Sequence, residues 1–323
     1  MTARSLFGPV ATLVVAAVIA LLPLTLSDYN RSTGALVGVF FTAILALNIV
    51  TGYTGQISIG HGAFMAVGGY TTAILTHDHG WNDLATLPLA LAFGFVAGVI
   101  VGLPALRFSG VYLALTTFAV ALAVPQIAKN YPNFTGGTEG LALPTHSGTW
   151  LYYVAWGVAA VAFVFAWLLL RGRTGRAFRA VRDSEIAAVS SGVSLPFHKT
   201  VSFGISAAMA AAAGSVYVLV NNFVNPDVFG LQLSLFILIG AVVGGLGSLW
   251  GVIVGAAFVE LLPIGLTSSS FTSSELVPVI FGAVVIAVMA LLPLGAASLL
   301  QRLLHFGSKT GESSDVPLGT EGT

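Results

Sequence analysis

The stretch GYTGQISIGHGAFMAVGGY, residues 52–70, decides the fold that the sequence predicts. It lies between two strongly apolar segments, is rich in glycine and carries Gln56, Ser58 and His61 in its middle. Because glycine weakens helices and polar groups are costly in lipid, an ordinary membrane-spanning helix avoids such a run. A soluble loop would be less apolar. The combination predicts a broken or re-entrant segment that lines a path through a membrane protein, where irregular backbone is tolerated.

Composition places the chain in a membrane. Of its 323 residues, 56% are hydrophobic and 7% are charged, whereas a soluble domain carries roughly 25% charged residues. The apolar runs are about 20 residues long, the length of a helix that crosses a hydrocarbon core of about 30 Å. The alternating strands of a transmembrane barrel do not occur. Since the chain has no cysteine, disulfides and thiolate metal sites are excluded.

We therefore expect an all-α integral membrane protein, a polytopic helix bundle of about ten segments, with eight as the lower count. The third and eighth segments are short and glycine-rich, so they are expected to be short or re-entrant. Residues 1–304 form the transmembrane domain and residues 305–323 a disordered cytoplasmic tail. The first segment is interpreted as a retained helix rather than a cleaved signal. The expected segments are 7–26, 33–51, 61–76, 85–105, 109–128, 150–170, 200–220, 231–248, 250–266 and 276–296.

Basic residues predict the orientation, because loops rich in Lys and Arg face the cytoplasm. Six of the twelve basic residues lie between the sixth and seventh segments, which makes that loop cytoplasmic. With ten crossings, Arg4, Arg107, Arg302 and Lys309 fall on the same side. Both termini are then cytoplasmic, and the loop 133–149 is external.

A short repeat suggests that the chain has two related halves. GVIVG occurs at 98–102 in the fourth segment and at 251–255 in the ninth. An offset of five crossings would invert the second half, an arrangement common in transporters, and would make the third and eighth segments counterparts. Five small apolar residues also recur by chance in such a composition, so an inverted 5+5 repeat is one of two interpretations.

Candidate path residues come from the opening stretch. Close helix packing accounts for its glycines without any substrate. It accounts less well for the polar side chains, which in membrane helices usually face the interior or a cavity. We expect a role at a translocation path or its cytoplasmic gate, with His61 a hydrogen-bonded structural histidine rather than a proton carrier. The candidates are Tyr53, Gln56, Ser58 and His61.

The cytoplasmic loop RGRTGRAFRAVRDSEIAAVSSGVSLPFHKT, residues 171–200, is the second candidate site. Its part 176–190 predicts an amphipathic helix with Ala177, Phe178, Val181 and Ile186 partly on one side, and Pro196 limits its continuation. Membrane orientation alone explains the arginines, but not the length of the loop or its small residues Ala187, Ala188 and Gly192. Small residues permit close docking of another protein, so we predict a docking helix for a cytoplasmic partner.

Other features point to packing rather than chemistry. The glycines at 94–102 and 240–255 have the three- and four-residue spacing of helix-packing seams. Glu260 is the one carboxylate deep in an apolar segment and should face a cavity, a partner or the interface. None of the lysines follows a glycine, which excludes a nucleotide cradle of the GxxxxGK[ST] type. We expect no catalytic residue, no metal and no cofactor.

Several blocks resemble one family. GYTGQISIGHGAFMAVGGY resembles the glycine-rich segment of branched-chain amino acid ABC transporter permeases, and the resemblance continues over most of the chain. Of the paired permeases, the chain is most similar to the M-type subunit, through its external loop and long docking loop. The further blocks are GLPALRFSGVYLALTTFA (102–119), NFTGGTEGLALP (133–144), residues 175–217 and NPDVFGLQLSLFILIGAVVGGLGSLWGVIVGA (225–256).

The resemblance implies partners and a mechanism. It implies a second permease subunit, two ATP-binding cassette subunits that hydrolyse ATP, and an external substrate-binding protein, in a bacterial-type cytoplasmic membrane. Membrane lipid surrounds the chain, and no nucleic acid is involved. The docking loop is similar to the coupling region of importers, with Glu185, Ala187, Ala188 and Gly192 in the form E-x-A-A-x-x-x-G. The usual motif has the glutamate directly before the two alanines, whereas here Ile186 is inserted between them. The residues expected at the ATPase interface are Arg179, Arg182, Glu185, Ala188 and Gly192.

We expect import of leucine, isoleucine and valine, because apolar groups and backbone would line most of the path. Permeases for urea and short-chain amides share these blocks, so a related amide importer is an alternative. A self-sufficient secondary transporter is an alternative of another class, although the scarcity of ionisable groups in the apolar segments argues against it. A structural scaffold would need neither the polar segment nor the docking loop.

Overall fold

A computed structural model describes residues 23, 27–105, 110–268, 276–291 and 295. Apart from Pro23, the expected first segment and the expected tail 305–323 lie outside these residues. The elements are α2 (Asp28–Leu47), the π-helix η2 (Asn48–Tyr53), α3 (His61–His79), α4 (Asp83–Ala105), α5 (Val111–Asn130), α6 (Pro132–Thr135), β1 (Leu141–Ala142), α7 (Gly148–Arg171), α8 (Arg173–Asp183), α9 (Glu185–Ser190), α10 (Leu195–Asn221), β2 (Phe223–Val224), η3 (Pro226–Phe229), α11 (Leu231–Gly244), α12 (Gly251–Ser268) and α13 (Val277–Leu291).

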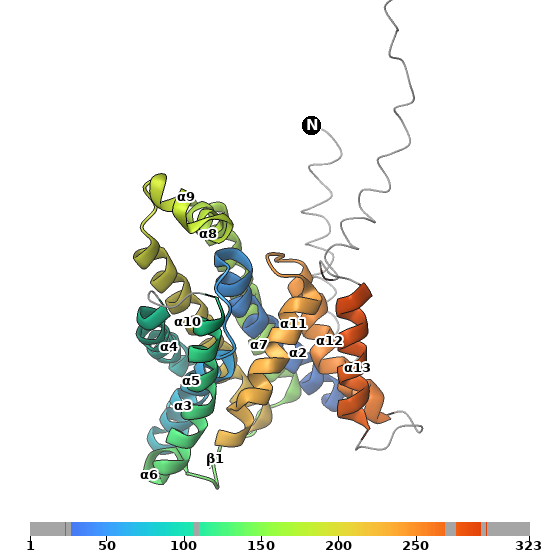
Figure 1. Ribbon diagram of the computed structural model, residues 1–323. Coiled ribbons are helices and arrows are strands. Elements are labelled where there is room, and N and C mark those ends of the chain that lie inside the picture. Colours follow the sequence, from blue (N-terminus) through green and yellow to red (C-terminus); the bar gives the residue numbers. More distant parts are fainter. Residues whose placement is uncertain (1–22, 24–26, 106–109, 269–275, 292–294, 296–323) are drawn as a thin grey trace, which may run out of the picture.

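Apolar helices dominate the part of the chain that the structure describes (Figure 1). Each of the other nine expected segments overlaps a described helix, the segment 33–51 overlapping both α2 and η2. Six spans in the described residues are long and apolar enough to cross a membrane: 28–53, α4, α5, α7, α10 and the η3–α11 stretch. The helices α12 and α13 are apolar but shorter. The chain is therefore an all-α polytopic membrane protein, as predicted.

Two helices form the centre of the bundle. The apolar windows of α2 and α10 are each 83% buried, whereas those of α4, α5 and α7 are only 22–33% buried. α2 packs against α7, α10 and α12, and α10 packs against α3 and α4. The outer helices leave apolar side chains such as Ile100, Leu115 and Val161 exposed, which suits a surface solvated by lipid.

Small residues bring the helices around α10 into backbone contact. A Cβ atom at Gly68 would overlap the backbone of Ala211, and one at Gly214 would overlap the backbone of Met65. On α4, Gly94 and Gly98 face α10 in the same way. The seam between α11 and α12 is also made by glycines, since Gly255 lies against Gly240. The predicted small-residue packing seams are confirmed.

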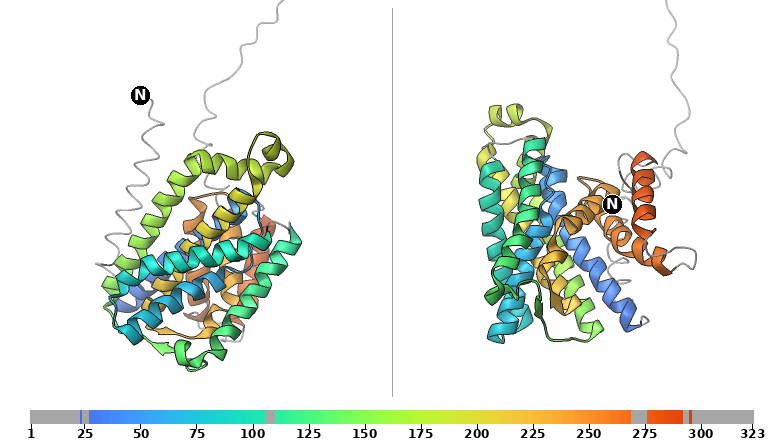
Figure 2. Two further views of the ribbon diagram at one scale, coloured as in Figure 1. Left: turned by 90° about the vertical axis from the view of Figure 1, so that its left-hand side faces the viewer. Right: turned by 60° about the horizontal axis from the view of Figure 1, so that its bottom comes forward.

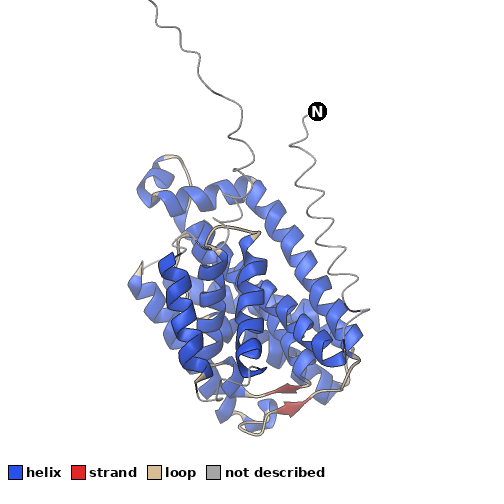
Figure 3. Cartoon of the chain, turned by 90° about the vertical axis from the view of Figure 1, so that its right-hand side faces the viewer, coloured by secondary structure: helices blue, strands red, loops and turns tan. Residues whose placement is uncertain are grey.

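The loops gather at two opposite ends of the bundle. The short helices α8 and α9 project at one end (Figures 1 and 2). At the other end lie β1 and β2, the two strands that Figure 3 shows. They pair in an antiparallel ladder in which Leu141 is aligned with Val224. The sequence did not predict these strands, because two residues are too few for a periodic pattern. They connect the loop after α6 to the segment between α10 and α11.

Candidate functional site

The chain breaks and reverses between α2 and α3. After the π-helix, residues 55–60 are non-helical and run back into the bundle. Gly55 adopts a φ of +71°, which glycine allows at no steric cost. The Gln56 N–H donates to Val50 O at 3.1 Å, and the Thr51 hydroxyl donates to Gln56 O at 3.1 Å. These bonds satisfy backbone groups that lose their helical partners at the break. The predicted break is therefore stabilised by specific hydrogen bonds.

Gln56 faces the central helix α10 from this break. Its Nε2 donates to Ser202 Oγ at 3.0 Å and to Thr54 Oγ1 at 2.9 Å. Its Oε1 is buried and has no hydrogen-bond partner among the described residues. Tyr53, one turn earlier, is 8% exposed. Ser202 was not predicted, although a serine in an alanine-rich helix was a signal that could have found it.

His61 lies in a chain of hydrogen bonds that fixes its tautomer. Ser206 Oγ donates its single hydrogen to Ala46 O at 2.6 Å, so it can only accept from His61 Nε2, 2.7 Å away. In the neutral imidazole, His61 Nδ1 then carries no hydrogen and accepts from Ser58 Oγ at 3.1 Å. Both ring nitrogens of the neutral imidazole are satisfied. His61 thus joins the start of α3 to α2 and α10.

The start of α3 also meets the start of α11. The Gly62 N–H donates to Ser234 Oγ at 2.9 Å, and a Cβ atom at Gly62 would collide with that hydroxyl. The structure thus brings the four path candidates to one region, buried against α2 and α10. Tyr53 adjoins Gly52, whose carbonyl accepts a hydrogen bond from Arg182 of α8. The exposed fractions are 8% for Tyr53, 5% for Gln56, 1% for Ser58 and 1% for His61.

The predicted docking helix is two helices rather than one. Residues 176–190 were expected to be continuous, but α8 ends at Asp183 and α9 begins at Glu185. Ser184 causes the break, because its backbone is extended and its Oγ accepts from the Ala187 N–H at 3.3 Å as an N-cap. Phe178 and Val181 are buried, as an amphipathic α8 requires, but Ile186 is 83% exposed. The prediction that Ile186 lies partly on the same side as Phe178 and Val181 was wrong.

Gly192 closes α9 with a Schellman motif. The Val193 N–H donates to Ala188 O and the Gly192 N–H to Val189 O, both at 2.9 Å. The motif requires a left-handed residue, and Gly192 has a φ of +81°. Ala188 is 2% exposed, on the face of α9 turned toward the protein. Ile186 and Val189 are the apolar side chains that α9 presents outward.

The predicted arginines contact the ends of two long helices. Arg179 Nη1 donates to Leu170 O near the end of α7, at 3.2 Å. Arg182 Nη1 donates to Gly52 O in the π-helix, at 3.1 Å, and Arg182 Nε pairs with Asp183. Helix C-termini carry unpaired carbonyls and partial negative charge, so both guanidinium groups are favourably placed.

Glu185 pairs with a buried lysine. Replacing the glutamate should destabilise the protein more than replacing the lysine. Lys199 Nζ lies 2.7 Å from Glu185 Oε1, with side chains 6% and 45% exposed. Glu185→Gln leaves a buried ammonium without its countercharge and should cost about 1–3 kcal/mol. Lys199→Met removes the buried charge and leaves a carboxylate that water can reach, so it should cost under about 1 kcal/mol. Thermal unfolding of the purified chain measures both. Equal destabilisation by the two variants would contradict this account.

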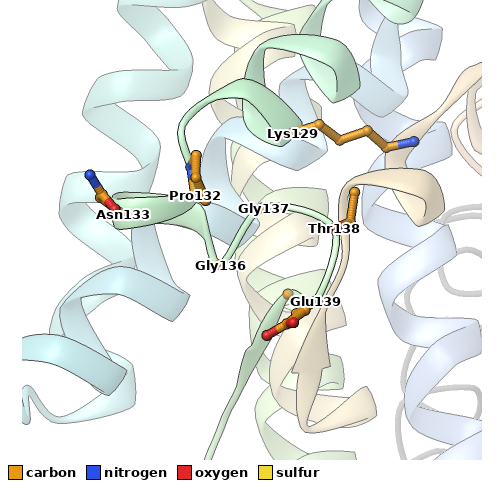
Figure 4. A pocket seen from close by; sticks show the side chains of 8 residues that line it. Lys129, Pro132, Asn133, Gly136, Gly137, Thr138 and Glu139 are labelled. Atoms are coloured by element: carbon orange, nitrogen blue, oxygen red, sulfur yellow. The ribbon is translucent and has the colours of Figure 1, made fainter.

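The opposite end of the bundle carries a glycine-rich turn with an open pocket of about 490 Å³ (Figure 4). Gly136, Gly137 and Gly140 all have positive φ, so the turn depends on glycine. Lys129 Nζ lies 2.5 Å from Asp227 Oδ1 and connects α5 to η3. The lining residues are Lys129, Pro132, Asn133, Gly136, Gly137, Thr138, Glu139 and Gly140.

An apolar helix bundle, a broken polar segment against its central helices and a charged helix pair at one end together define a polytopic integral membrane protein. The particular family follows from comparison of sequences. The chain belongs to the family described as branched-chain amino acid transport system / permease component, whose model matches residues 32–289.

Curated relatives agree with this membership. The permease protein LivM of a high-affinity branched-chain amino acid transport system in Salmonella typhimurium is 34% identical over 244 residues, covering 66% of this chain and 57% of the relative. LivM of Escherichia coli K12 is 32% identical over 266 residues, covering 72% and 63%. LivH of Salmonella typhimurium is 26% identical over 291 residues, covering 82% and 91%. The chain thus spans about three fifths of the LivM relatives. No solved structure matches.

Proposed function

We propose that the chain is a permease subunit of an ATP-driven importer for leucine, isoleucine and valine in the cytoplasmic membrane. The LivM and LivH relatives are permeases of branched-chain amino acid transport systems, which supports the substrate class. The partners would be a second permease, two ATP-binding cassette subunits and an external substrate-binding protein. ATP hydrolysis would take place on the partner subunits, so this chain would not itself be an enzyme.

The observation that carries this proposal is the α8–α9 pair. It lies at one end of the bundle (Figure 1) and exposes 83% of Ile186 and 54% of Val189 outside the apolar helices. Exposed apolar side chains in that position are typical of a surface that binds a protein partner. Arginines at the same end support its cytoplasmic orientation. The helix α9 would dock the ATPase. Arg179, Arg182 and Glu185 would lie around the contact, and Ala188 and Gly192 would determine the shape of α9.

Ten crossings in two inverted halves form part of the proposal. Helix neighbours in the described residues support it: α4 packs on α10 as α12 packs on α2, and α3 packs on α4 as α11 packs on α12. α3 follows the non-helical residues 55–60, whereas α11 follows η3 with Gly230 between them, and the first turns of α3 and α11 meet at Gly62 and Ser234. By this count both termini are cytoplasmic. The path would pass near Tyr53, Gln56, Ser58 and His61.

Uptake by the purified assembly tests the function. Vesicles are prepared that contain the chain together with its partner permease, the ATPases and the binding protein. ATP is supplied on the side of the membrane where the ATPases lie. We expect accumulation of radiolabelled leucine that excess isoleucine and valine suppress and excess urea or acetamide does not. Suppression by the amides alone would support an amide importer. Uptake by the chain alone, driven by an ion gradient, would support a secondary transporter.

Gly192 gives a prediction about the docking element. The site has room for a side chain, because an added Cβ atom would meet nothing within 4 Å, but its φ of +81° is unfavourable for most residues. Gly192→Val should cost about 1–2 kcal/mol in the left-handed region and lower uptake by misplacing the end of α9. Gly192→Asn is the matched control, since asparagine tolerates that conformation. Equal uptake by Val, Asn and wild-type proteins would contradict the docking role.

A further inference from the structure

Asn48 joins two segments that lie 200 residues apart. It is the first residue of the π-helix, and it is 1% exposed. Its Nδ2 donates to Ser248 O at 2.8 Å, and its Oδ1 accepts from the Gly247 N–H at 2.7 Å. Ser248 and Gly247 lie in the turn between α11 and α12. One buried amide therefore satisfies two backbone groups of that turn, a donor and an acceptor together.

Arg182 brings α8 to the same place. It donates to the carbonyl of Gly52, one turn after Asn48. A Cβ atom at Gly52 would collide with Asn48 Oδ1 and with the Gly247 nitrogen, so no side chain fits between the π-helix and the turn. Gly247 has a φ of +80°, and a Cβ atom there would lie 3.3 Å from Arg182 Nη1. We call these residues the junction: Asn48, Gly52, Arg182, Gly247 and Ser248.

The junction is continuous with the hydrogen-bond chain around His61. Ala46, two residues before Asn48, accepts the hydrogen bond from Ser206 that fixes His61. A displacement of the end of α2 would therefore act on the start of α3 through direct bonds. The turn at Gly247 leads into α11 and α12, so the same displacement would reach the second half of the bundle.

We propose that Asn48 and Arg182 are positioning residues that make α8, the end of α2 and the α11–α12 turn move as one body. This inference rests on the proposed function, because it gives the ATPase-docking segment a mechanical connection to both halves of the permease. Neither side chain would need to touch the substrate. Their loss should separate ATP hydrolysis from transport, while substrate binding by the external protein stays unchanged.

Alanine variants test the connection in the reconstituted assembly. Asn48→Ala should keep ATP hydrolysis near the wild-type rate but lower the leucine taken up per ATP about tenfold, the factor that corresponds to about 1.4 kcal/mol of lost hydrogen bonding. Arg182→Ala should lower the leucine taken up per ATP by a similar factor, because it loses a charge-assisted hydrogen bond. Arg176→Ala is the matched control, an exposed arginine on the same helix. Gel filtration confirms that each variant assembles. If both alanine variants take up as much leucine per ATP as the wild-type protein, the inference is overturned and the proposed function is not. If the wild-type assembly takes up no leucine, the proposed function is overturned as well.

A covalent replacement makes the test specific. The chain has no native cysteine, and a Cβ atom at Gly55 would lie 3.6 Å from the Cβ of Arg182, within the range of about 3.5–4.5 Å that disulfides use. In the double variant Gly55→Cys/Arg182→Cys, oxidation should restore the uptake per ATP that Arg182→Cys loses, and reduction should remove it again. Gly55→Cys alone controls for strain at that residue. Arrest of uptake on oxidation would show that α8 must move relative to the segment that follows the π-helix, and would overturn the inference.

Discussion

Gly68→Ala is expected to prevent α3 from docking closely onto α10. The new methyl group would overlap the main chain of Ala211, which cannot rotate away as a side chain could. Overpacking in a well-packed core costs typically about 1–3 kcal/mol and occasionally more. Because the obstacle here is backbone, we expect at least about 3 kcal/mol. The neighbouring contact of Gly214 with Met65 lies on the same seam and would be strained by the same displacement.

The matched control is Gly157→Ala on α7. A Cβ atom there would meet nothing within 4 Å, so the substitution should stabilise the helix by about 0.5–1 kcal/mol through reduced backbone entropy. Thermal unfolding in detergent, followed by the fluorescence of the five tryptophans, compares the two variants. If Gly68→Ala unfolds at the same temperature as Gly157→Ala, α3 and α10 do not pack backbone to backbone.

His61→Phe is expected to have the second large effect. The ring keeps its size, but Ser58 loses the acceptor for its hydroxyl and Ser206 loses the donor that it accepts from. A buried polar group left unsatisfied costs about 1–3 kcal/mol, so the substitution should cost about 2–4 kcal/mol. His77→Phe at the far end of α3 is the control, because His77 is exposed and should tolerate the change.

A double-mutant cycle separates the hydrogen bond from general packing. Ser206→Ala alone removes the acceptor of His61 Nε2 and the donor to Ala46 O. If His61 and Ser206 interact as described, the double variant should be less destabilised than the sum of the single variants by about 0.6–1.7 kcal/mol, the range found for hydrogen bonds inside membrane proteins. Strict additivity would mean that the two side chains do not interact.

The sequence predicted the helices because their signal is local. Apolar runs of about the length of a bilayer identified the long helices, and glycine at three- and four-residue spacing identified the seams. The break after Tyr53 was visible as polar and glycine residues inside an apolar stretch. Each of these inferences used neighbours along the chain, and the structure agrees with each of them.

The partners of the predicted residues could not be found in the same way. Asn48 and Gly247 are 199 residues apart, and no local pattern indicates that an asparagine at the end of an apolar helix holds a distant turn. No local pattern indicated the role of Ser206 either, because that role depends on how α10 packs against α2. The break at Ser184 carried a local N-cap signal, but the apolar periodicity on both sides of it favoured one continuous helix.

The way α9 is capped has a consequence for assembly. Its N-cap at Ser184 and its Schellman motif at Gly192 use only atoms of residues 184–193, so the shape of this segment does not depend on a partner being bound. Ordering the backbone of a loop on association costs about 1–2 kcal/mol for each residue that is free beforehand. Because the backbone of α9 is already fixed, most of the binding free energy of Ile186 and Val189 remains available for affinity. A partner could then dissociate and return without the segment having to fold again.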